Sequence, residues 1–308
     1  HGLARHTVSN VERRTSNVES RMSNAQHHAA DTSGELFALE TPAPMPALYG
    51  CWYVGTSGYV FSDWRGTVYP AHLSERALLS YYLAEFKFNA LELNFTFYHM
   101  PDAAQMAQFA ARVPPLYQLA VKAHQSLTHQ TGHGDPGTAF AAFSAALAPL
   151  RDHGMLAAVL LQFPFAFHRT PGTCDWLRRC RDEFPADPLV IEFRHDSWRA
   201  PETDVLLQQM NCAQCIVDEP PLRGLMPLHC ADTGPLLYLR LHGRNRAWFT
   251  AGEKERYNYH YSDDELRDIL RRVRAIAGQT RKVLAFFNNC YMGRAVRNAL
   301  RFRELLAS

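Results

Sequence analysis

Residues Leu236–His242 read L-L-Y-L-R-L-H, and this stretch decides the fold of the chain. Leucines alternate in it with a tyrosine, an arginine and a histidine. Such alternation is typical of a β-strand, because successive side chains of a strand point to opposite faces of the sheet. The pattern recurs as N-A-L-E-L-N at Asn89–Asn94 and as L-V-I-E-F-R at Leu189–Arg194. The sequence therefore predicts several strands with one apolar face and one polar face.

Apolar stretches of strand length occur eight times in the chain, and longer amphipathic stretches separate them. The predicted strands are Cys51–Thr56, Asn89–Asn94, Tyr117–Lys122, Leu156–Phe163, Leu189–Arg194, Gln214–Asp218, Leu236–His242 and Lys282–Asn288. The predicted helices include Ser74–Phe86, Ala103–Arg112, Ala139–Arg151, Thr173–Glu183, Glu202–Met210 and Asp263–Ala277. Ser74 and Asp263 are the expected N-caps of their helices.

Eight strand-then-helix units predict an α/β fold, a (β/α)8 TIM-like barrel. A doubly wound open sheet is the alternative architecture. It usually carries a Gly-rich first turn, G-x-G-x-x-G, and this sequence has no such turn after its first predicted strand. The barrel is therefore the favoured fold.

The first 47 residues differ from the rest of the chain. Ser9–Thr15 reads SNVERRT and Ser16–Met22 reads SNVESRM, a seven-residue repeat with one apolar position. A coiled coil needs two apolar positions per heptad, so the repeat predicts disorder. Thr41–Ala47 reads TPAPMPA, a Pro-rich linker. We therefore predict a disordered tail at residues 1–47 and a barrel domain at residues 48–308.

Composition and charge narrow the function classes. The net charge is only +2, which does not favour an extended nucleic-acid surface. No apolar run reaches the roughly 18 residues of a membrane span. Seven cysteines, an odd number in a long chain, argue against a disulfide framework. We expect a cytoplasmic protein without membrane contact, and the sequence indicates no oligomeric state.

Polar side chains gather at the predicted C-terminal ends of the strands. They are Glu92, Asn94, Lys122, Gln162, Glu192, Arg194, Asp218, Arg240, His242 and Asn288. Their neighbours of opposite parity are mostly apolar and belong on the helix side, so we expect the polar set to point into the barrel mouth. Active sites of TIM barrels lie at this end. The alternative is a structural ion-pair network that fills the barrel, such as Glu192 with Arg240.

The predicted loops at the same end carry aromatic and basic residues. The aromatic ones are Tyr59, Trp64, Tyr69, Phe97, Tyr98, Trp198 and Trp248. They either stack on a ring-shaped ligand, such as a sugar or a base, or pack the loops onto the rim. Arg244, Arg246 and Arg294 follow the last two strands, where barrels often bind phosphate. These arginines indicate an anion site or a solvated basic rim.

The chain also resembles the YecE-like family of TIM barrels, a family of unknown function. The shared motifs are G-T-S-G-Y (Gly55–Tyr59), W-x-G-x-x-Y-P (Trp64–Pro70), F-N-A-L-E-L-N-x-T-F-Y (Phe88–Tyr98), Q-F-P (Gln162–Pro164), E-F-R-H-x-S-W (Glu192–Trp198), Y-L-R-L-H-G-R (Tyr238–Arg244), F-F-N-N (Phe286–Asn289) and N-A-L (Asn298–Leu300). They span the predicted barrel in the family's order. The resemblance implies the barrel fold and implies no particular activity.

Two function classes remain open. The first is an enzyme, with a hydrolase as one class it would fit, that acts on a small polar or phosphorylated compound by acid–base chemistry. The second is a non-catalytic module that binds an anionic or nucleic-acid ligand, although nucleic acid is not favoured. The candidate catalytic residues are Glu92, Glu192, Asp218 and His242. The candidate ligand-binding residues are Asn94, Tyr98, Lys122, Gln162, Arg194, Trp198, Arg240, Arg244, Asn288 and Asn289.

The paired glutamates suggest the chemistry of the first class. One carboxyl would act as the acid and the other as the base if their surroundings split their pKa values. A divalent metal held by the glutamates, Asp218 and His242 is the alternative. Several cationic side chains share the mouth and would repel a metal ion. We therefore expect no metal and no cofactor.

Overall fold

The computed structural model describes residues 51–130, 136–252, 254–278 and 281–308. The predicted tail at residues 1–47 lies outside the described residues. The strands are β1 (Trp52–Thr56), β2 (Ala90–Leu93), β3 (Gln118–Lys122), β4 (Leu156–Gln162), β5 (Leu189–Glu192), β6 (Ala213–Asp218), β7 (Leu237–Leu241) and β8 (Val283–Phe287). All eight predicted strands are confirmed, with bounds that differ by no more than two residues at either end.

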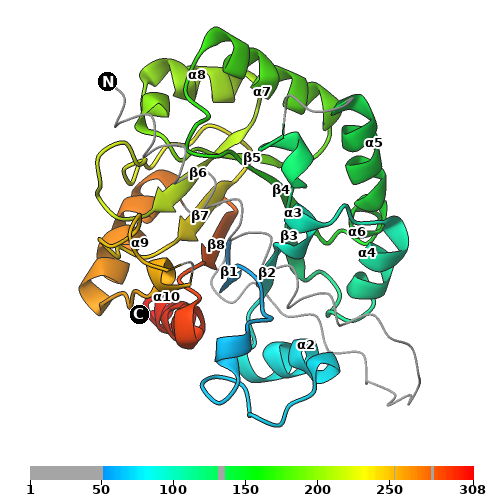
Figure 1. Ribbon diagram of the computed structural model, residues 1–308, viewed down its shortest axis with the longest axis vertical. Helices are drawn as coiled ribbons and strands as arrows, with labels where there is room; N and C mark the ends of the chain where they lie inside the picture. The colour runs from blue at the N-terminus through cyan, green and yellow to red at the C-terminus, as the bar shows by residue number, and fades with distance from the viewer. Residues whose placement is uncertain (1–50, 131–135, 253, 279–280) are drawn as a thin grey trace.

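The strands form one parallel sheet in the order β1-β8-β7-β6-β5-β4-β3-β2. Figure 1 shows them at the centre of the molecule with the helices around them. The α-helices are α2 (Leu78–Tyr81), α3 (Phe95–Tyr98), α4 (Ala103–Ala110), α5 (Pro136–Ala146), α6 (Ala148–Asp152), α7 (Pro171–Glu183), α8 (Pro201–Gln209), α9 (Asp263–Ala277) and α10 (Arg294–Ala307). Short 3-10 or π turns are η2 (Ser62–Trp64), η3 (Glu75–Ala77), η4 (Tyr82–Phe86), η5 (Gln125–Leu127), η6 (Asp196–Trp198), η7 (Glu255–Tyr257) and η8 (Tyr291–Gly293). The predicted (β/α)8 TIM-like barrel is confirmed.

The joint between β1 and β2 closes the ring by a different means from the other joints. The Asn89 side chain spans it, because Val54 N donates to Asn89 Oδ1 at 2.8 Å and Asn89 Nδ2 donates to the Trp52 carbonyl at 3.1 Å. Gly55 permits the close approach, since a Cβ on it would lie 1.9 Å from the Ala90 carbonyl oxygen. A side-chain amide and a missing side chain therefore bring the first and second strands together.

Side-chain parity divides the core into two apolar clusters, as the sequence predicts. The cluster under the helices contains Leu91, Ile191 and Leu239. The cluster inside the barrel contains Leu160 and Phe286, among mostly small residues. Because each strand contributes alternate residues to each cluster, the last inward residue of each strand faces the barrel mouth.

Three predicted helices differ in detail. The stretch predicted as Ser74–Phe86 runs through a 3-10 turn, one α-turn and a π-turn, and it ends at Lys87, whose φ of 50° is left-handed. The stretch predicted as Ala139–Arg151 is divided into α5 and α6, with Pro149 in the first turn of α6. Helix α9 is capped by Ser262 and not by Asp263, because the Ser262 hydroxyl and the Glu265 side chain form a capping box.

Candidate active site

A buried ion-pair network forms the floor of the barrel mouth. Arg240 on β7 reaches two carboxylates: its Nη2 lies 2.7 Å from Glu92 Oε1 and its Nη1 lies 2.7 Å from Glu192 Oε2. The Tyr238 hydroxyl donates to Glu92 Oε2 at 2.6 Å. The side chains of both glutamates are fully buried. The ion pair between Glu192 and Arg240 that the sequence offers as a structural alternative is therefore present.

A second set of contacts lies on the Glu192 side of the floor. Arg194 Nε lies 2.7 Å from Glu192 Oε1, and Arg194 Nη1 lies 3.0 Å from Glu219 Oε2. His242 Nε2 lies 3.3 Å from the same Glu192 oxygen. On the other side of the imidazole, Asn288 Nδ2 lies 2.7 Å from His242 Nδ1. With the amide donating to Nδ1, the ring carries its proton on Nε2 and directs it at Glu192.

The surroundings give Glu192 and His242 opposite electrostatic roles. Burial opposes ionisation of Glu192, but Arg240 and Arg194 outweigh it and hold the pKa of that carboxyl well below its usual range. Burial, aided by the positive charge of Arg194, lowers the pKa of His242 to about 3. At neutral pH Glu192 is therefore an anion and His242 is a neutral hydrogen-bond donor.

Glu219, which was not among the candidate residues predicted from the sequence, is a buried carboxyl with a raised pKa. Burial raises its pKa to about 8, with Arg194 opposing and the charge of Glu192 adding to the rise. Arg194 contacts two carboxyls, and its electrostatic attraction to Glu192, the closer one, is stronger than its attraction to Glu219. Glu219 Oε1 accepts a hydrogen bond from Met226 N at 3.1 Å, which fixes the carboxyl in place. A carboxylic acid that keeps its proton near neutral pH is suited to general-acid work.

Strand parity explains why Glu219 replaces Asp218 in the mouth. On β6 Cys215 and Val217 belong to the inner cluster and Ile216 to the outer one, so Glu219 points inward and Asp218 outward. Asp218 accepts hydrogen bonds from Arg244 Nη2 at 2.7 Å and from the Tyr261 hydroxyl at 2.6 Å. The expectation that Asp218 points into the mouth is wrong. The inward-facing positions of β6 are Cys215 and Val217, and the next position of the same parity is Glu219.

Arg244 belongs to the same outward cluster as Asp218. Its Nη1 also lies 3.2 Å from Glu265 Oε1 on α9, so two carboxylates occupy its guanidinium. Near the start of α10, Met292 N donates to Asp63 Oδ2 at 2.7 Å. Carboxylates of the protein itself therefore occupy Arg244 and one backbone N–H group of the expected phosphate site.

The remaining candidate ligand-binding residues fall into two groups. Asn94, Lys122, Gln162, Arg194 and Asn288 are inward-facing ends of β2, β3, β4, β5 and β8. Lys122 Nζ lies 3.8 Å from the centre of the Phe97 ring, and Gln162 Nε2 donates to the Phe163 carbonyl at 2.7 Å. Tyr98 is partly buried at the end of α3, with its ring against Phe97. This group lines the mouth or its rim.

Trp198 and Asn289 are packing residues, contrary to the expectation. Trp198 is 1% exposed, stacks on Phe193 with ring centres 4.1 Å apart, and donates to the Phe167 carbonyl at 2.6 Å. Asn289 is fully buried and donates to the Tyr259 carbonyl at 2.8 Å and to Asn298 Oδ1 at 2.9 Å. Neither side chain is available to a ligand.

Most of the aromatic loop residues also pack the rim. Trp64, Tyr69, Phe97, Trp198 and Trp248 are all buried. His129, which the sequence analysis did not select, packs edge-on against Phe97 with ring centres 4.9 Å apart. Burial, together with the charges of Lys122 and Arg194, lowers the pKa of His129 to about 3. Of the two interpretations of the aromatic loops, packing holds for these residues.

The described part of the chain has neither a cluster of metal-ligating side chains nor a membrane-spanning helix. Within residues 51–130, 136–252, 254–278 and 281–308, no three His, Cys, Asp or Glu side chains are grouped so that they could hold a metal ion. None of the described helices combines the length and the apolar character needed to span a membrane.

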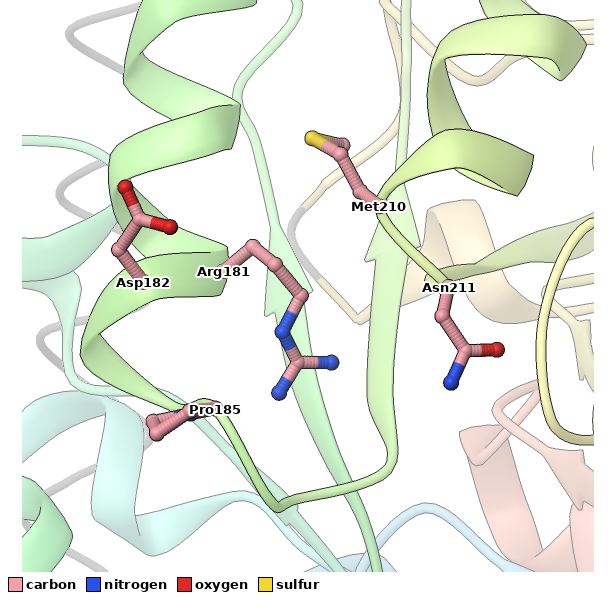
Figure 2. Close-up of a pocket in the computed structure, with 5 residues that line it drawn as sticks. All are labelled: Arg181, Asp182, Pro185, Met210 and Asn211. Carbon is pink, nitrogen blue, oxygen red and sulfur yellow. The ribbon is translucent and has the colours of Figure 1, made fainter.

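A pocket of about 300 Å³ lies at the opposite end of the barrel (Figure 2). It is lined by Arg181, Asp182 and Pro185 at the end of α7 and by Met210 and Asn211 after α8. Arg181 Nη2 donates to the Asp187 carbonyl at 3.1 Å, so this arginine also stabilises the loop before β5. The pocket shares no residue with the mouth.

Residues 53–308 match the family described as protein of unknown function DUF72. The chain belongs to the DUF72 family. The resemblance to the YecE-like family is thereby confirmed. The UPF0759 protein YunF of Bacillus subtilis (strain 168) is 30% identical over 271 residues, which cover 82% of this chain and 94% of that protein.

Crystal structures of other DUF72 proteins have the same fold. A DUF72 family protein from Thermotoga maritima MSB8 has a TM-score of 0.78 and 39% identity, over 83% of this chain and 99% of that one. Another from Enterococcus faecalis V583 has a TM-score of 0.73 and 26% identity, over 83% of this chain and 96% of that one. The described DUF72 barrel therefore shares its TIM-barrel architecture with these relatives.

Proposed function

We propose that this DUF72 protein is a hydrolase of small phosphorylated compounds, with Arg194 holding the phosphoryl group and Glu219 acting as the general acid. The observation that carries the proposal is the contact of Arg194 Nη1 with Glu219 Oε2 at 3.0 Å, on a guanidinium whose side chain is still 14% exposed. Its Nε and Nη1 are engaged by carboxyls, and the Nη2 group is left for an anion. An acid and an anion-binding group are thus joined in one pair.

The charges of the mouth favour an anionic ligand. Arg240 neutralises the two carboxylates of the floor, so they do not repel an anion. Lys122, on β3 and two strands from Arg194, supplies a second cation on the inner side of the barrel. The oxygens of a phosphoryl group can accept both N–H bonds of the Arg194 Nη2 group, which a simple halide cannot reproduce.

The proposed step is hydrolysis of a phosphate ester. Water attacks phosphorus, the bond from phosphorus to the ester oxygen breaks, and Glu219 gives its proton to that leaving oxygen. The carboxylate then recovers a proton from the water that attacked. General-acid catalysis of this kind contributes roughly 100-fold to 10,000-fold in rate.

A non-catalytic anion-binding module is the second candidate. It is favoured by the two floor glutamates, the acid and base pair expected from the sequence, because Arg240 occupies an oxygen of each. The two candidates differ in whether a bound ester is turned over.

Thermal unfolding and phosphate release test the proposal. Inorganic phosphate at a hundredfold excess over its dissociation constant should stabilise the protein by about 2.7 kcal/mol, and chloride at equal ionic strength by much less. Arg194→Lys should abolish the difference, because lysine keeps the charge beside Glu192 and lacks the Nη2 group. Arg246→Gln, at an exposed position on the seventh loop, is the matched control.

Phenyl phosphate supplies the catalytic test. The wild-type protein should release phosphate from it, and Glu219→Gln should slow the release by about 100-fold while phosphate binding remains. Binding without any release would support the anion-binding module. Equal protection by chloride and phosphate would contradict both candidates.

A further inference from the structure

Four aromatic rings from three loops form a cluster on the rim of the mouth, and we call Phe165, His168, His195 and Phe249 the rim platform. Phe165 and His168 follow β4, His195 follows β5, and Phe249 follows β7. His168 and His195 stack with ring centres 3.8 Å apart and planes 20° apart. Phe165 meets His195 edge-on at 4.8 Å and Phe249 at 6.2 Å.

The rim platform stays open to solvent, unlike the buried loop residues Trp64, Tyr69, Phe97, Trp198 and Trp248. Phe249 is 39% exposed, His168 is exposed, and Phe165 is partly exposed. Burial, with a contribution from His168, lowers the pKa of His195. Its imidazole is therefore neutral at pH 7 and offers an uncharged flat face to the stack.

The three consecutive residues Gly224, Leu225 and Met226 contact both the rim platform and Glu219. Met226 N binds Glu219, Leu225 forms a β-bridge with His195, and Gly224 lies against the Phe165 ring. Gly224 has a φ of +89°, and a Cβ on it would lie 3.1 Å from that ring, so glycine lets the segment pass close to Phe165. His195 also follows Arg194 directly in the sequence.

We infer that the rim platform binds a flat aromatic or heteroaromatic ring attached to the phosphoryl group that Arg194 holds. The inference rests on the proposed function and names its substrate class, a small aryl or heterocyclic phosphate ester. The stacked imidazoles already form a column of parallel rings, and a further flat ring extends such a column by offset stacking. A puckered saturated ring has no π face and gains less from the same surface.

Three probes distinguish binding of the phosphoryl group from binding of the ring. They are inorganic phosphate, phenyl phosphate and cyclohexyl phosphate. Calorimetric titration should show phenyl phosphate binding about tenfold more tightly than the other two, since stacking of one ring contributes about 1–3 kcal/mol. Phe249→Ala and His168→Ala should remove the tenfold gain and leave the affinity for inorganic phosphate unchanged. Val205→Ala, at an exposed apolar position on α8, is the control and should keep the gain.

Each other outcome overturns the inference. Equal affinity for phenyl phosphate and inorganic phosphate would show that the rim platform does not bind the ring, although the phosphate site exists. Equal affinity for phenyl and cyclohexyl phosphate would show an apolar surface with no preference for flat rings. A gain that survives both substitutions would place the ring elsewhere. Loss of binding of all three probes in the wild-type protein would contradict the proposed function itself, and the inference with it.

Discussion

Arg240 and Glu92 face each other across the barrel, 148 positions apart in the chain, with Nη2 and Oε1 separated by 2.7 Å. The same guanidinium holds Glu192 through Nη1. Removing one member of a buried ion-pair network leaves an uncompensated charge, which is far more costly than replacing the whole network by neutral groups. The floor of the mouth is therefore a unit whose members depend on one another.

Arg240→Met tests this dependence. The substitution should lower the free energy of unfolding by about 3–5 kcal/mol, because the buried Glu92 loses the arginine that neutralises it and Glu192 keeps only Arg194. The triple variant Glu92→Gln, Glu192→Gln, Arg240→Met should recover most of the loss. Urea unfolding measures both. A single substitution that costs less than about 1 kcal/mol would show that the floor contributes little to stability.

Glu219 should make stability fall as pH rises. Its pKa is about 8 in the folded protein against an ordinary value of 4.5, so the folded state holds the proton over this interval and the unfolded state does not. Stability is then lost between about pH 4.5 and pH 8, at up to about 1.4 kcal/mol per pH unit. The difference in unfolding free energy between the wild-type protein and Glu219→Gln should change with that slope. A difference that is flat with pH, or that rises, contradicts the assignment.

Arg244 should matter for stability although it lies on a loop. Arg244→Gln leaves the buried Asp218 carboxylate with the Tyr261 hydroxyl and without its cation, and should cost about 1.5–3 kcal/mol. Arg246→Gln, two positions further on and exposed, should change stability by no more than about 0.5 kcal/mol. Chemical denaturation compares the two. Equal effects would mean that Arg244 acts only as part of a solvated rim.

Gly55 should tolerate no side chain. A Cβ there would lie 1.9 Å from the Ala90 carbonyl oxygen, so Gly55→Ala must separate β1 from β2 or move the backbone. We expect a fall in melting temperature of at least about 10 °C, or failure to fold. Gly172→Ala is the matched control, because a Cβ at that helix position would meet nothing within 4 Å. Similar melting temperatures for the two variants would contradict the close approach.

Alternation along the strands was enough to predict the barrel and the inward set of β2, β5 and β7. It failed at the end of β6, where two adjacent acidic residues, Asp218 and Glu219, follow the apolar residues Ile216 and Val217. Only the positions of Cys215 and Val217 inside the barrel decide which of them enters the mouth. The alternation of Cys215 and Val217, continued to the next position of the same parity, is the sequence signal that could have identified Glu219.

Other features of the site depend on contacts between distant parts of the chain. Trp198 looks like a ligand-stacking residue in the sequence, yet Phe193 and Phe167 cover it from two sides. The sharing of Arg240 between Glu92 and Glu192 requires the diameter of the closed barrel, which no local pattern gives. Sequence patterns locate the end of the barrel that carries the chemistry, and three-dimensional packing selects the residues.

The joint at Asn89 also affects how the barrel fluctuates. The other strand pairs are held by backbone ladders, whereas β1 and β2 are joined by the Asn89 side chain at one end and by the bridge at Ser57 and Glu92 at the other. Transient openings of a closed ring begin at its weakest connection, so the Val54 amide should exchange its hydrogen faster than the amides of β4. Such an opening would admit water beneath Glu92, from the side of the ring remote from Glu219. Water would then reach the buried floor between β1 and β2, and the loops of the mouth would not have to move.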